Sequence, residues 1–332
     1  MGTLAGQQVL VTGADGFIGS HLVQRLLADG ARVRALCVYT SSGSLGWLEE
    51  LTEEERDNVD VRLGDVRDAE LVADLVRGCD VVLHLAALIA IPYSYQAPRS
   101  FVETNVTGTL NVLEAVRRSG SARLVHTSTS EVYGTPEQVP IRETHPLHGQ
   151  SPYSASKIGA DMLCEAYARS FEVPVTVLRP FNTFGPRQSA RAVIPTVLQQ
   201  MLAGAKTIRL GSLRPRRDFT YVADTCDGFV RAASAELPAG SLVQLGTGRD
   251  VSIGELVEMC RAVTQSDAVV ETDDERVRPE GSEVERLLSD PTRARELLGW
   301  EPTVGLEEGL ARTAQWLAAR PLDPRSAARY QR

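Results

Sequence analysis

The chain reads Gln8-Val-Leu-Val-Thr-Gly13-Ala-Asp-Gly16-Phe-Ile-Gly19 near its N-terminus, and this stretch decides its fold. The first five residues suit a buried strand, and the spacing of apolar residues after Phe17 is typical of a helix. Three glycines between strand and helix allow a tight turn and a close approach of the backbone to another group. The free N–H groups at the helix start would face a pyrophosphate, so the stretch predicts a dinucleotide site.

Beyond this stretch, short apolar strands and helices alternate through the first half of the chain. Strands are expected at 32–39, 60–64, 81–85, 123–127 and 175–179, and helices at 17–29, 69–77, 100–119 and 153–171. Continuous apolar strands that alternate with helices indicate a parallel sheet covered on both faces. We therefore predict an α/β fold with a doubly wound parallel sheet and right-handed crossovers.

The alternation of strands and helices loosens after about residue 180, so we expect a domain boundary there. We expect a dinucleotide-binding domain at 1–180, which also receives a later segment near 219–250, and a mainly substrate-binding domain at 181–320. Within the second lobe, Ser252 and Glu255 form a capping box that opens a helix. The tail 321–332 lacks apolar periodicity and is expected to be loosely held.

Composition excludes several classes of protein. The chain has 332 residues, 43% of them apolar, and a net charge of −8, which argues against disorder and against a nucleic-acid binder. No apolar run approaches the roughly 20 residues of a membrane span, and no signal peptide is evident, so we expect a cytoplasmic protein. Five scattered cysteines without a Cys-x-x-Cys pair are expected to be buried thiols, with no metal site. The acidic run within 48–58 predicts a solvated helix face.

The choice between NAD and NADP stays open. An acid at the end of the second strand usually meets the 2′-hydroxyl of the adenosine ribose. Here that region, 36–42, contains no Asp or Glu that would reject a 2′-phosphate and no Arg that would bind one. Asp65, after the third strand, is a candidate to face adenine, although an exposed loop acid is the competing interpretation.

A reactive constellation follows the strand at 123–127. This strand runs into Ser128-Thr129-Ser130-Glu131, and Tyr153 and Lys157 stand one helical turn apart on one face of a later helix. A nearby ammonium favours phenolate, so the pKa of Tyr153 is expected to fall toward neutrality. Phenolate can take a proton from a sugar hydroxyl while hydride leaves the same carbon, and the Thr129 hydroxyl can orient that group.

With these motifs in place, the chain resembles the extended short-chain dehydrogenases/reductases of the nucleotide-sugar epimerase/dehydratase group. The resemblance covers nearly the whole chain and also includes His84-Leu-Ala-Ala87, Asn105-Val-x-Gly-Thr, Arg179-Pro-Phe-Asn182-Thr-Phe-Gly-Pro and Arg217-Asp-Phe-x-Tyr-Val. It implies a Rossmann domain, a smaller C-terminal α/β domain that closes over a nucleoside-diphosphate sugar, and a homodimer formed through the Asn105 and Tyr153 helices.

The resemblance also assigns ligand-contacting residues. It implies a tightly bound, internally recycled NAD or NADP held by Gly13, Gly16, Phe17, Ile18, Gly19, Tyr39, Asp65, Val66, Leu85, Ala86, Ala87, Asn105, Thr127, Tyr153, Lys157 and Pro180. Arg217 and Arg278 are implied to clamp the substrate diphosphate, with Asn182 beside them and Arg191 as a further candidate. Planar guanidinium groups suit this task because they bind phosphate oxygens bidentately.

Within the family, Glu131 narrows the expected reaction. It stands where 4,6-dehydratases carry the base for the C5 proton, whereas simple 4-epimerases generally lack it. The dTDP-glucose dehydratases carry an aspartate directly before this glutamate, whereas this chain carries Ser130 there, as the GDP-mannose type does. Either Glu131 therefore both removes the C5 proton and protonates the departing 6-hydroxyl, or Ser130 relays a proton to that hydroxyl. The stretches 88–95 and 181–193 look most like dehydratases of legionaminic-acid-type pathways, which implies a nucleotide-linked N-acetylglucosamine.

Several alternatives remain beside the predicted 4,6-dehydratase. A 5,6-dehydratase and a 4-epimerase would use the same fold. A UDP-glucuronate decarboxylase typically carries Arg-x-x-Tyr-Asp-Glu, where this chain reads Gln150-Ser-Pro-Tyr153-Ser-Ala. A non-catalytic cofactor-binding scaffold is a different class, and it would have no need to keep Thr129, Tyr153 and Lys157 together. His84 and His126 lie in buried strands and are expected to be core residues.

Overall fold

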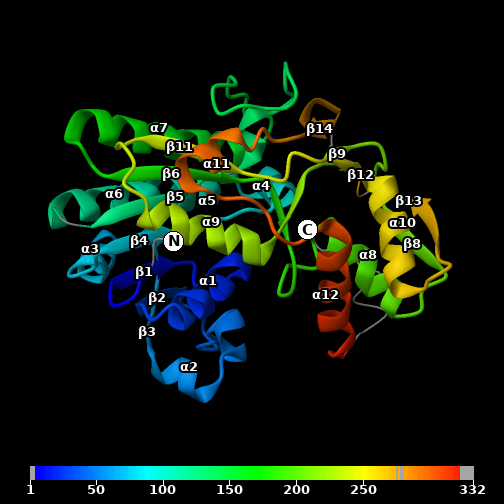
Figure 1. Ribbon diagram of the computed structural model, residues 1–332, viewed down its shortest axis with the longest axis horizontal. Helices are drawn as coiled ribbons and strands as arrows, with labels where there is room; N and C mark the ends of the chain where they lie inside the picture. The colour runs from blue at the N-terminus through cyan, green and yellow to red at the C-terminus, as the bar shows by residue number, and fades with distance from the viewer. Residues whose placement is uncertain (1–3, 121, 274–275, 277–279, 322–332) are drawn as a thin grey trace.

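A seven-stranded parallel sheet organises the larger lobe (Figure 1). The computed structural model describes residues 4–120, 122–273, 276 and 280–321, so almost all of the tail expected at 321–332 lies outside the described residues. The strand order is β11-β6-β5-β4-β1-β2-β3. The strands are β1 (Gln8–Thr12), β2 (Arg32–Val38), β3 (Val59–Gly64), β4 (Val81–His84), β5 (Arg123–Thr127), β6 (Val175–Pro180) and β11 (Ser241–Leu245).

Helices cover both faces of this sheet, because its central strands β1 and β4 are buried on both sides. Val9 and Val11 face one way and pack with α1 (Phe17–Ala28), α9 (Val222–Ser234) and α11 (Thr292–Leu298). Leu10 faces the other way and packs with α3 (Ala69–Val76), α6 (Gly108–Ser119) and α7 (Pro152–Phe171). The predicted doubly wound α/β fold is confirmed.

The helix predicted at 100–119 is present but is not uniform. It consists of α5 (Pro98–Phe101), a π-helical stretch η2 (Val102–Thr107) and α6. Short π-helical segments inside longer helices are frequent at functional sites. The shorter helices of this lobe are η1 (Gly46–Glu50), α2 (Glu53–Asp57), α4 (Ile91–Gln96) and η3 (Ser130–Tyr133).

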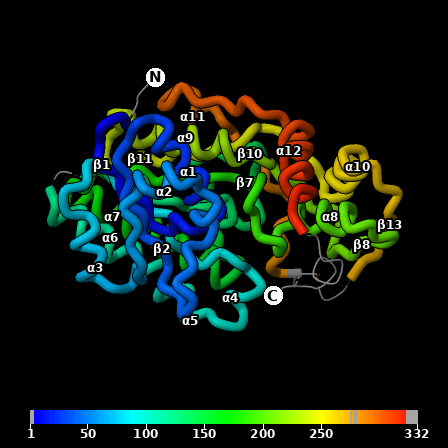
Figure 2. The backbone as a smooth tube through the Cα atoms, turned by 90° about the horizontal axis from the view of Figure 1, so that it is seen from below, coloured from blue at the N-terminus to red at the C-terminus, as the bar shows by residue number. Residues whose placement is uncertain are grey.

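Among the described residues, the smaller lobe is built from three small sheets and three packed helices. Figure 2 shows these helices, α8, α10 and α12, grouped at its right-hand end. The sheets pair β7 (Asn182–Phe184) with β10 (Phe219–Tyr221), β8 (Thr207–Leu210) with β13 (Val269–Thr272), and β9 (Arg216–Arg217) with both β12 (Val251–Ser252) and β14 (Arg286–Leu287). The helices are α8 (Val193–Leu202), α10 (Ile253–Thr264) and α12 (Leu306–Ala318), and a short turn η5 (Glu280–Ser282) precedes β14. Between the elements of this lobe, the chain returns to the larger sheet through α9 and β11.

Buried charge joins the loop after β7 to the larger lobe. Arg187, which has a left-handed φ of +68°, donates from Nε to Glu50 Oε2 at 3.1 Å and from Nη1 to Ser20 Oγ at 3.3 Å. Arg320, just after α12, donates to the other Glu50 oxygen at 2.6 Å. The prediction of a solvated acidic face is therefore correct for α2, which has no buried residue, but wrong for Glu50.

All five cysteines are buried free thiols, as predicted. Within the described part of the chain, no helix combines the length and the apolar character needed to cross a membrane.

Candidate active site

The carboxyl ends of the parallel strands bring the candidate residues to one edge of the sheet. The chain order runs outward in both directions from the neighbouring strands β1 and β4. In open α/β sheets, ligands bind in the crevice outside such a switch point. The glycine loop follows β1, Leu85–Ala87 follow β4, Thr129–Glu131 follow β5, and Asn182 follows β6.

The glycine loop fits the pyrophosphate of a dinucleotide. Gly13 has φ +67°, and a Cβ there would lie 2.8 Å from the Ala86 nitrogen, so a side chain would collide with the loop after β4. At Gly19, a Cβ would lie 2.1 Å from the Gly13 oxygen, so α1 packs directly on the turn. The N-cap Gly16 offers no side-chain cap to α1. The first N–H groups of α1 are thus suited to an anion.

Polar side chains fix the loop after β4 against the loop after β1. Thr12 Oγ1 accepts from the N–H groups of Leu85 at 3.2 Å and Ala86 at 3.1 Å. Asn105, on η2, accepts from the Leu88 N–H at 2.8 Å and donates to the Leu88 oxygen at 3.0 Å and to Ser156 Oγ at 2.9 Å. The Asn105 amide therefore holds this loop onto α7.

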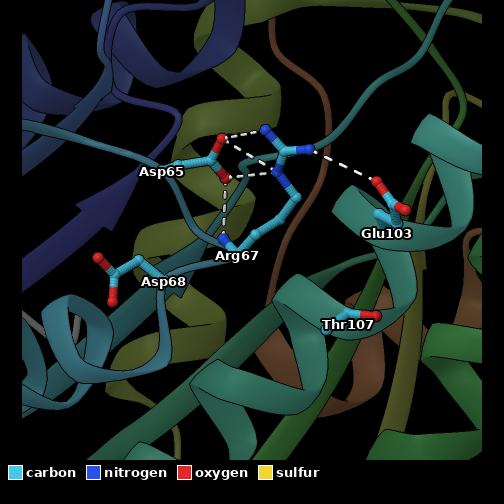
Figure 3. A pocket seen from close by; sticks show the side chains of 5 residues that line it. All are labelled: Asp65, Arg67, Asp68, Glu103 and Thr107. Carbon is cyan, nitrogen blue, oxygen red and sulfur yellow. Dashed lines mark hydrogen bonds and ion pairs between the residues drawn. The ribbon is translucent and has the colours of Figure 1, made fainter.

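Asp65 lies at a pocket of about 460 Å³ beyond β3, lined by Asp65, Arg67, Asp68, Glu103 and Thr107 (Figure 3). Arg67 donates to Asp65 from its backbone N–H at 2.9 Å and from Nη2 at 2.6 Å, and its Nη1 lies 3.6 Å from Glu103. The Arg67 guanidinium lowers the pKa of Asp65. The neighbouring Val66 is buried and packs against Gly108 at the start of α6.

Thr129, Glu131 and Tyr153 come together at the end of β5. Thr129 caps η3, and its Oγ1 accepts from the Glu131 N–H at 3.2 Å. The Thr129 hydroxyl also acts on the Tyr153 hydroxyl and lowers its pKa, whereas the Glu131 charge acts in the opposite direction. The Tyr153 ring is buried with Ile91 and Phe101. The structure thus unites three of the predicted catalytic residues.

A capping box sets the start of α7 and therefore the direction of Tyr153. Ser151 Oγ accepts from the Ser154 N–H at 3.1 Å, and Ser154 Oγ accepts from the Ser151 N–H at 3.0 Å. Pro152 occupies the first helical position, where its missing N–H costs nothing. Tyr153 and Lys157 lie one turn apart on the helix that begins there.

Lys157 is buried, and its ammonium donates to the Thr127 carbonyl at 2.6 Å. Burial lowers the pKa of Lys157, and the charge of Asp161 opposes that shift. The pKa of Tyr153 is raised rather than lowered, mainly because its hydroxyl is buried, while Thr129 acts in the lowering direction and Glu131 raises it further. The expectation that Lys157 lowers the pKa of Tyr153 toward neutrality is therefore wrong for this structure, since burial disfavours phenolate most strongly.

A buried ionic cluster lies beneath Lys157, and the site predicted from the sequence did not include it. Asp161 Oδ2 accepts from Ser128 Oγ at 2.6 Å and from Arg179 Nη2 at 2.7 Å, and Asp161 Oδ1 lies 3.4 Å from His126 Nε2. Burial acts to raise the pKa of Asp161, but His126, Arg179 and Ser128 together lower it to about 2. Its only sequence signal was the position of Asp161 one turn after Lys157.

The same arginine links the cluster to η3 and β11. Arg179 Nη1 donates to the Tyr133 hydroxyl at 3.1 Å, and this hydroxyl donates to Gln244 Oε1 at 2.9 Å. The guanidinium also lies 5.0 Å from the centre of the Tyr133 ring. Because Tyr133 ends the short helix that carries Glu131, these bonds fix the position of Glu131 relative to α7.

The smaller lobe reaches the reactive residues through the segment 282–287. Val284 and Leu287 are buried against Val132 in η3. Ser282 forms a hydrogen bond with Tyr95 of α4, the helix whose Ile91 packs on Tyr153. These contacts hold the smaller lobe against this edge of the sheet.

Three of the four predicted substrate residues lie in the smaller lobe, Asn182 of β7 among them, and the fourth lies outside the described residues. Arg217 is buried on β9 and donates from Nη2 to Glu283 Oε1 at 3.1 Å. Arg191 is exposed and bonds to Ser189. Arg278 lies outside the described residues.

Two buried oxygens at the sheet edge lack a hydrogen-bond partner among the described residues. They are Thr127 Oγ1, at the end of β5, and Asn182 Oδ1, just after β6. Buried polar atoms are nearly always paired, so these two atoms fit contacts to a bound ligand.

Comparison with known proteins agrees with this arrangement. A protein family described as GDP-mannose 4,6 dehydratase matches residues 10–313. A UDP-glucose 4-epimerase from Mycolicibacterium smegmatis is 37% identical over 318 residues, which cover 93% of this chain and 98% of that protein. A dTDP-glucose 4,6-dehydratase from Xanthomonas campestris is 34% identical over 333 residues, covering 92% of each chain.

A solved structure shows the same architecture. The dTDP-glucose 4,6-dehydratase DesIV from Streptomyces venezuelae, with NAD and TYD bound, superposes with a TM-score of 0.84 at 32% identity. The match covers 93% of this chain and 96% of that one.

Proposed function

Because the chain belongs to the GDP-mannose 4,6-dehydratase family of NAD-dependent nucleotide-sugar enzymes, we propose that it is a nucleoside-diphosphate-hexose 4,6-dehydratase. The reaction oxidises C4, eliminates water across C5 and C6, and reduces C6, which gives a 4-keto-6-deoxy sugar. The observation that carries this proposal is Glu131, held beside Thr129 and Tyr153 at the end of β5.

The cofactor site is proposed at the edge formed by β1, β2 and β4. The N–H groups at the start of α1 would hold the pyrophosphate, and the Thr127 hydroxyl and Lys157 would lie at the nicotinamide end. A bound NAD or NADP would supply the hydride acceptor for C4 and the hydride donor for C6.

Tyr153 is the proposed base for the first step. Its phenolate takes the proton of the substrate 4-hydroxyl, and the neighbouring Thr129 hydroxyl orients that group. Since burial raises the pKa of Tyr153, the positive charge of a bound oxidised nicotinamide would be needed to favour the phenolate.

Glu131 is the proposed base for the second step. Once C4 is a ketone, the C5 proton is acidic, and the Glu131 carboxylate removes it. The 6-hydroxyl leaves as water with one proton. If Glu131 supplies that proton, the proton that returns to C5 comes from solvent; if the buried Ser130 relays a solvent proton to the 6-hydroxyl, Glu131 returns its own proton to C5. In both cases Glu131 ends the cycle as a carboxylate, and Tyr153 releases the proton of the 4-hydroxyl to solvent.

Substrate binding is assigned to the smaller lobe. Arg217, Arg191 and Arg278 are the proposed partners of the diphosphate, and the unpaired Asn182 oxygen is a proposed substrate acceptor. The sugar is proposed to be a nucleotide-linked N-acetylglucosamine. Arg217 must exchange or share its bond to Glu283 when a diphosphate binds.

A labelling experiment tests the reaction. A substrate that carries deuterium at C4 is incubated with the enzyme, and the product is examined by mass spectrometry and NMR. A 4,6-dehydratase loses one water and delivers the deuterium to C6. Deuterium at C4 of a product of unchanged mass, or carbon dioxide release, would contradict the proposal.

A 4-epimerase is the second candidate, because a UDP-glucose 4-epimerase is 37% identical to this chain. An epimerase needs Tyr153 but has no step for a base at C5, so Glu131 would have no chemical task. The labelling experiment separates the two reactions, since an epimerase returns the deuterium to C4.

A homodimer is part of the proposal. Three large apolar side chains on η2 and α7 are about half exposed: Val102, Met162 and Phe171. Pairing of these helices with those of a second copy would cover them. Light scattering of the purified protein tests this assembly.

A further inference from the structure

The end of β2 lacks the acid that usually binds the adenosine ribose, yet a carboxylate reaches this place from the glycine loop. Asp15 Oδ2 accepts the N–H of Val38, the last residue of β2, at 3.3 Å. The loop after β2 then folds back onto Asp15. The Trp47 N–H donates to the backbone carbonyl oxygen of Asp15 at 3.0 Å, and a Cβ at Gly46 would lie 2.6 Å from that carbonyl oxygen.

Within the described residues, no lysine or arginine neutralises this carboxylate. Among the described residues, the Asp15 carboxylate accepts the Val38 N–H, and its own N–H also acts to lower its pKa. Arg34 on β2 and Arg62 on β3 are both paired with Asp60. Residues 39–46, which follow β2, carry no charged side chain. Burial raises the pKa of Asp15, and the two N–H groups act in the opposite direction.

We propose that Asp15 replaces the missing acid of β2 and makes this chain select NAD over NADP. A carboxylate between the glycine loop and the end of β2 accepts hydrogen bonds from the ribose hydroxyls of NAD. The same charge repels the 2′-phosphate of NADP, and no cation at the end of β2 offsets that repulsion. The inference rests on the proposed dinucleotide site but not on the reaction that the enzyme catalyses.

A purely structural role is the competing explanation, because Asp15 also fixes the loop after β2. Asp15→Asn separates the two roles. An asparagine keeps an oxygen that accepts the Val38 N–H, but it removes the charge. Glu49→Gln is the matched control. Glu49 lies in η1, directly after the loop that follows β2, and it is exposed. It accepts hydrogen bonds from Ser44 Oγ at 2.7 Å and from the Leu45 N–H at 3.0 Å.

The experiment measures binding rather than turnover. Calorimetric titration of the nucleotide-stripped protein with NAD and with NADP gives both dissociation constants, and mass spectrometry identifies the nucleotide that copurifies. We expect the wild-type protein and Glu49→Gln to bind NAD at least about tenfold more tightly than NADP. In Asp15→Asn, this ratio should fall about tenfold, mainly through tighter NADP binding.

Three results would overturn the inference: equal affinities in the wild-type protein, a preference for NADP, or an unchanged ratio in Asp15→Asn. If neither nucleotide binds, the dinucleotide site itself is wrong and the inference fails with it. If NAD is selected through Asp15 but no water is lost from any nucleotide sugar, only the proposed reaction fails. Thermal unfolding shows whether Asp15→Asn is folded, and Asp15→Ser replaces it in the titrations if it is not.

Discussion

Tyr153 is the residue on which the proposed oxidation depends most directly. Replacing it with phenylalanine keeps the ring that packs on Ile91 and Phe101 and removes only the hydroxyl beside Thr129. We expect Tyr153→Phe to reduce turnover by about 10²–10⁴-fold and to leave dinucleotide binding unchanged. Steady-state kinetics measures turnover, and calorimetric titration measures dinucleotide binding, in the wild-type protein and in the variant.

Tyr167→Phe is the control for this change, because its hydroxyl lies on the same helix but donates to Glu114 at 2.6 Å. Turnover of Tyr153→Phe within threefold of the control would remove Tyr153 from the mechanism.

Glu131 distinguishes elimination from oxidation. Glu131→Gln keeps the shape of the side chain and the cap from Thr129 but cannot act as a base. We expect the variant to form the 4-keto form of the intact hexose while water loss stops, as followed by mass spectrometry. Glu137→Gln, an exposed change shortly after η3, should turn over normally. Normal dehydration by Glu131→Gln would leave the C5 proton without its proposed base and refute that role.

At the level of elements, neighbouring strands place two histidines side by side in the core. His84 of β4 and His126 of β5 are register partners, and both are buried. Burial lowers the pKa of His126 to about 4, and the charge of Lys157 adds to that shift. The unfolded chain therefore takes up a proton between pH 6.5 and about 4 that the folded chain does not, so stability is lost as the pH falls through this range.

This linkage predicts a specific pH dependence. The free energy of unfolding, measured in urea at several pH values, should decrease from pH 6.5 toward pH 4, with His126 contributing on the order of 1–3 kcal/mol. His126→Gln should flatten this decrease, whereas His148→Gln, which changes an exposed histidine, should not. Identical slopes for wild type and His126→Gln would show that His126 is not the group involved.

The elements themselves were largely predictable from the sequence. The apolar runs predict β1, β4 and β5 to within one residue. A strand buried on both faces is a continuous apolar run, so it can be recognised in the sequence without knowing which strands lie beside it. The capping box at Ser252 and Glu255 likewise opens α10 as predicted. Such signals are local in sequence.

The remaining features depend on distant partners, which a single sequence does not display. Glu50 looked like one more exposed acid until Arg187, 137 residues later, was found beside it. The raised pKa of Tyr153 arises from burial by α4 and α5, and the value for Asp161 arises from Arg179 on another strand. Asp15 follows the same rule, since its relation to β2 is visible only in the fold.

For the molecule as a whole, the ion pair between Glu50 and Arg187 joins the two lobes. Arg187 is buried, whereas Glu50 is one-quarter exposed and remains paired with Arg320 when Arg187 is removed. We expect Arg187→Gln to lower the free energy of unfolding by about 1–3 kcal/mol. Arg320→Gln, which changes the more exposed partner of Glu50, should cost clearly less.

A double-mutant cycle with Glu50→Gln isolates the pair. Denaturant unfolding of both single variants and the double variant should give a coupling energy of about 0.5–3 kcal/mol. Additive effects would show that Glu50 and Arg187 stabilise the lobes independently.

The late arrival of β11 has a consequence for synthesis of the chain. The ribosome releases β6 more than sixty residues before β11, its partner in the finished sheet (Figure 1). Every residue of β6 is buried in the folded protein, so an edge that β11 later covers stays unpaired while the chain is growing. Unpaired strand edges of this kind invite pairing with other chains. Nascent chains that stop before Ser241 should therefore be the most dependent on chaperones.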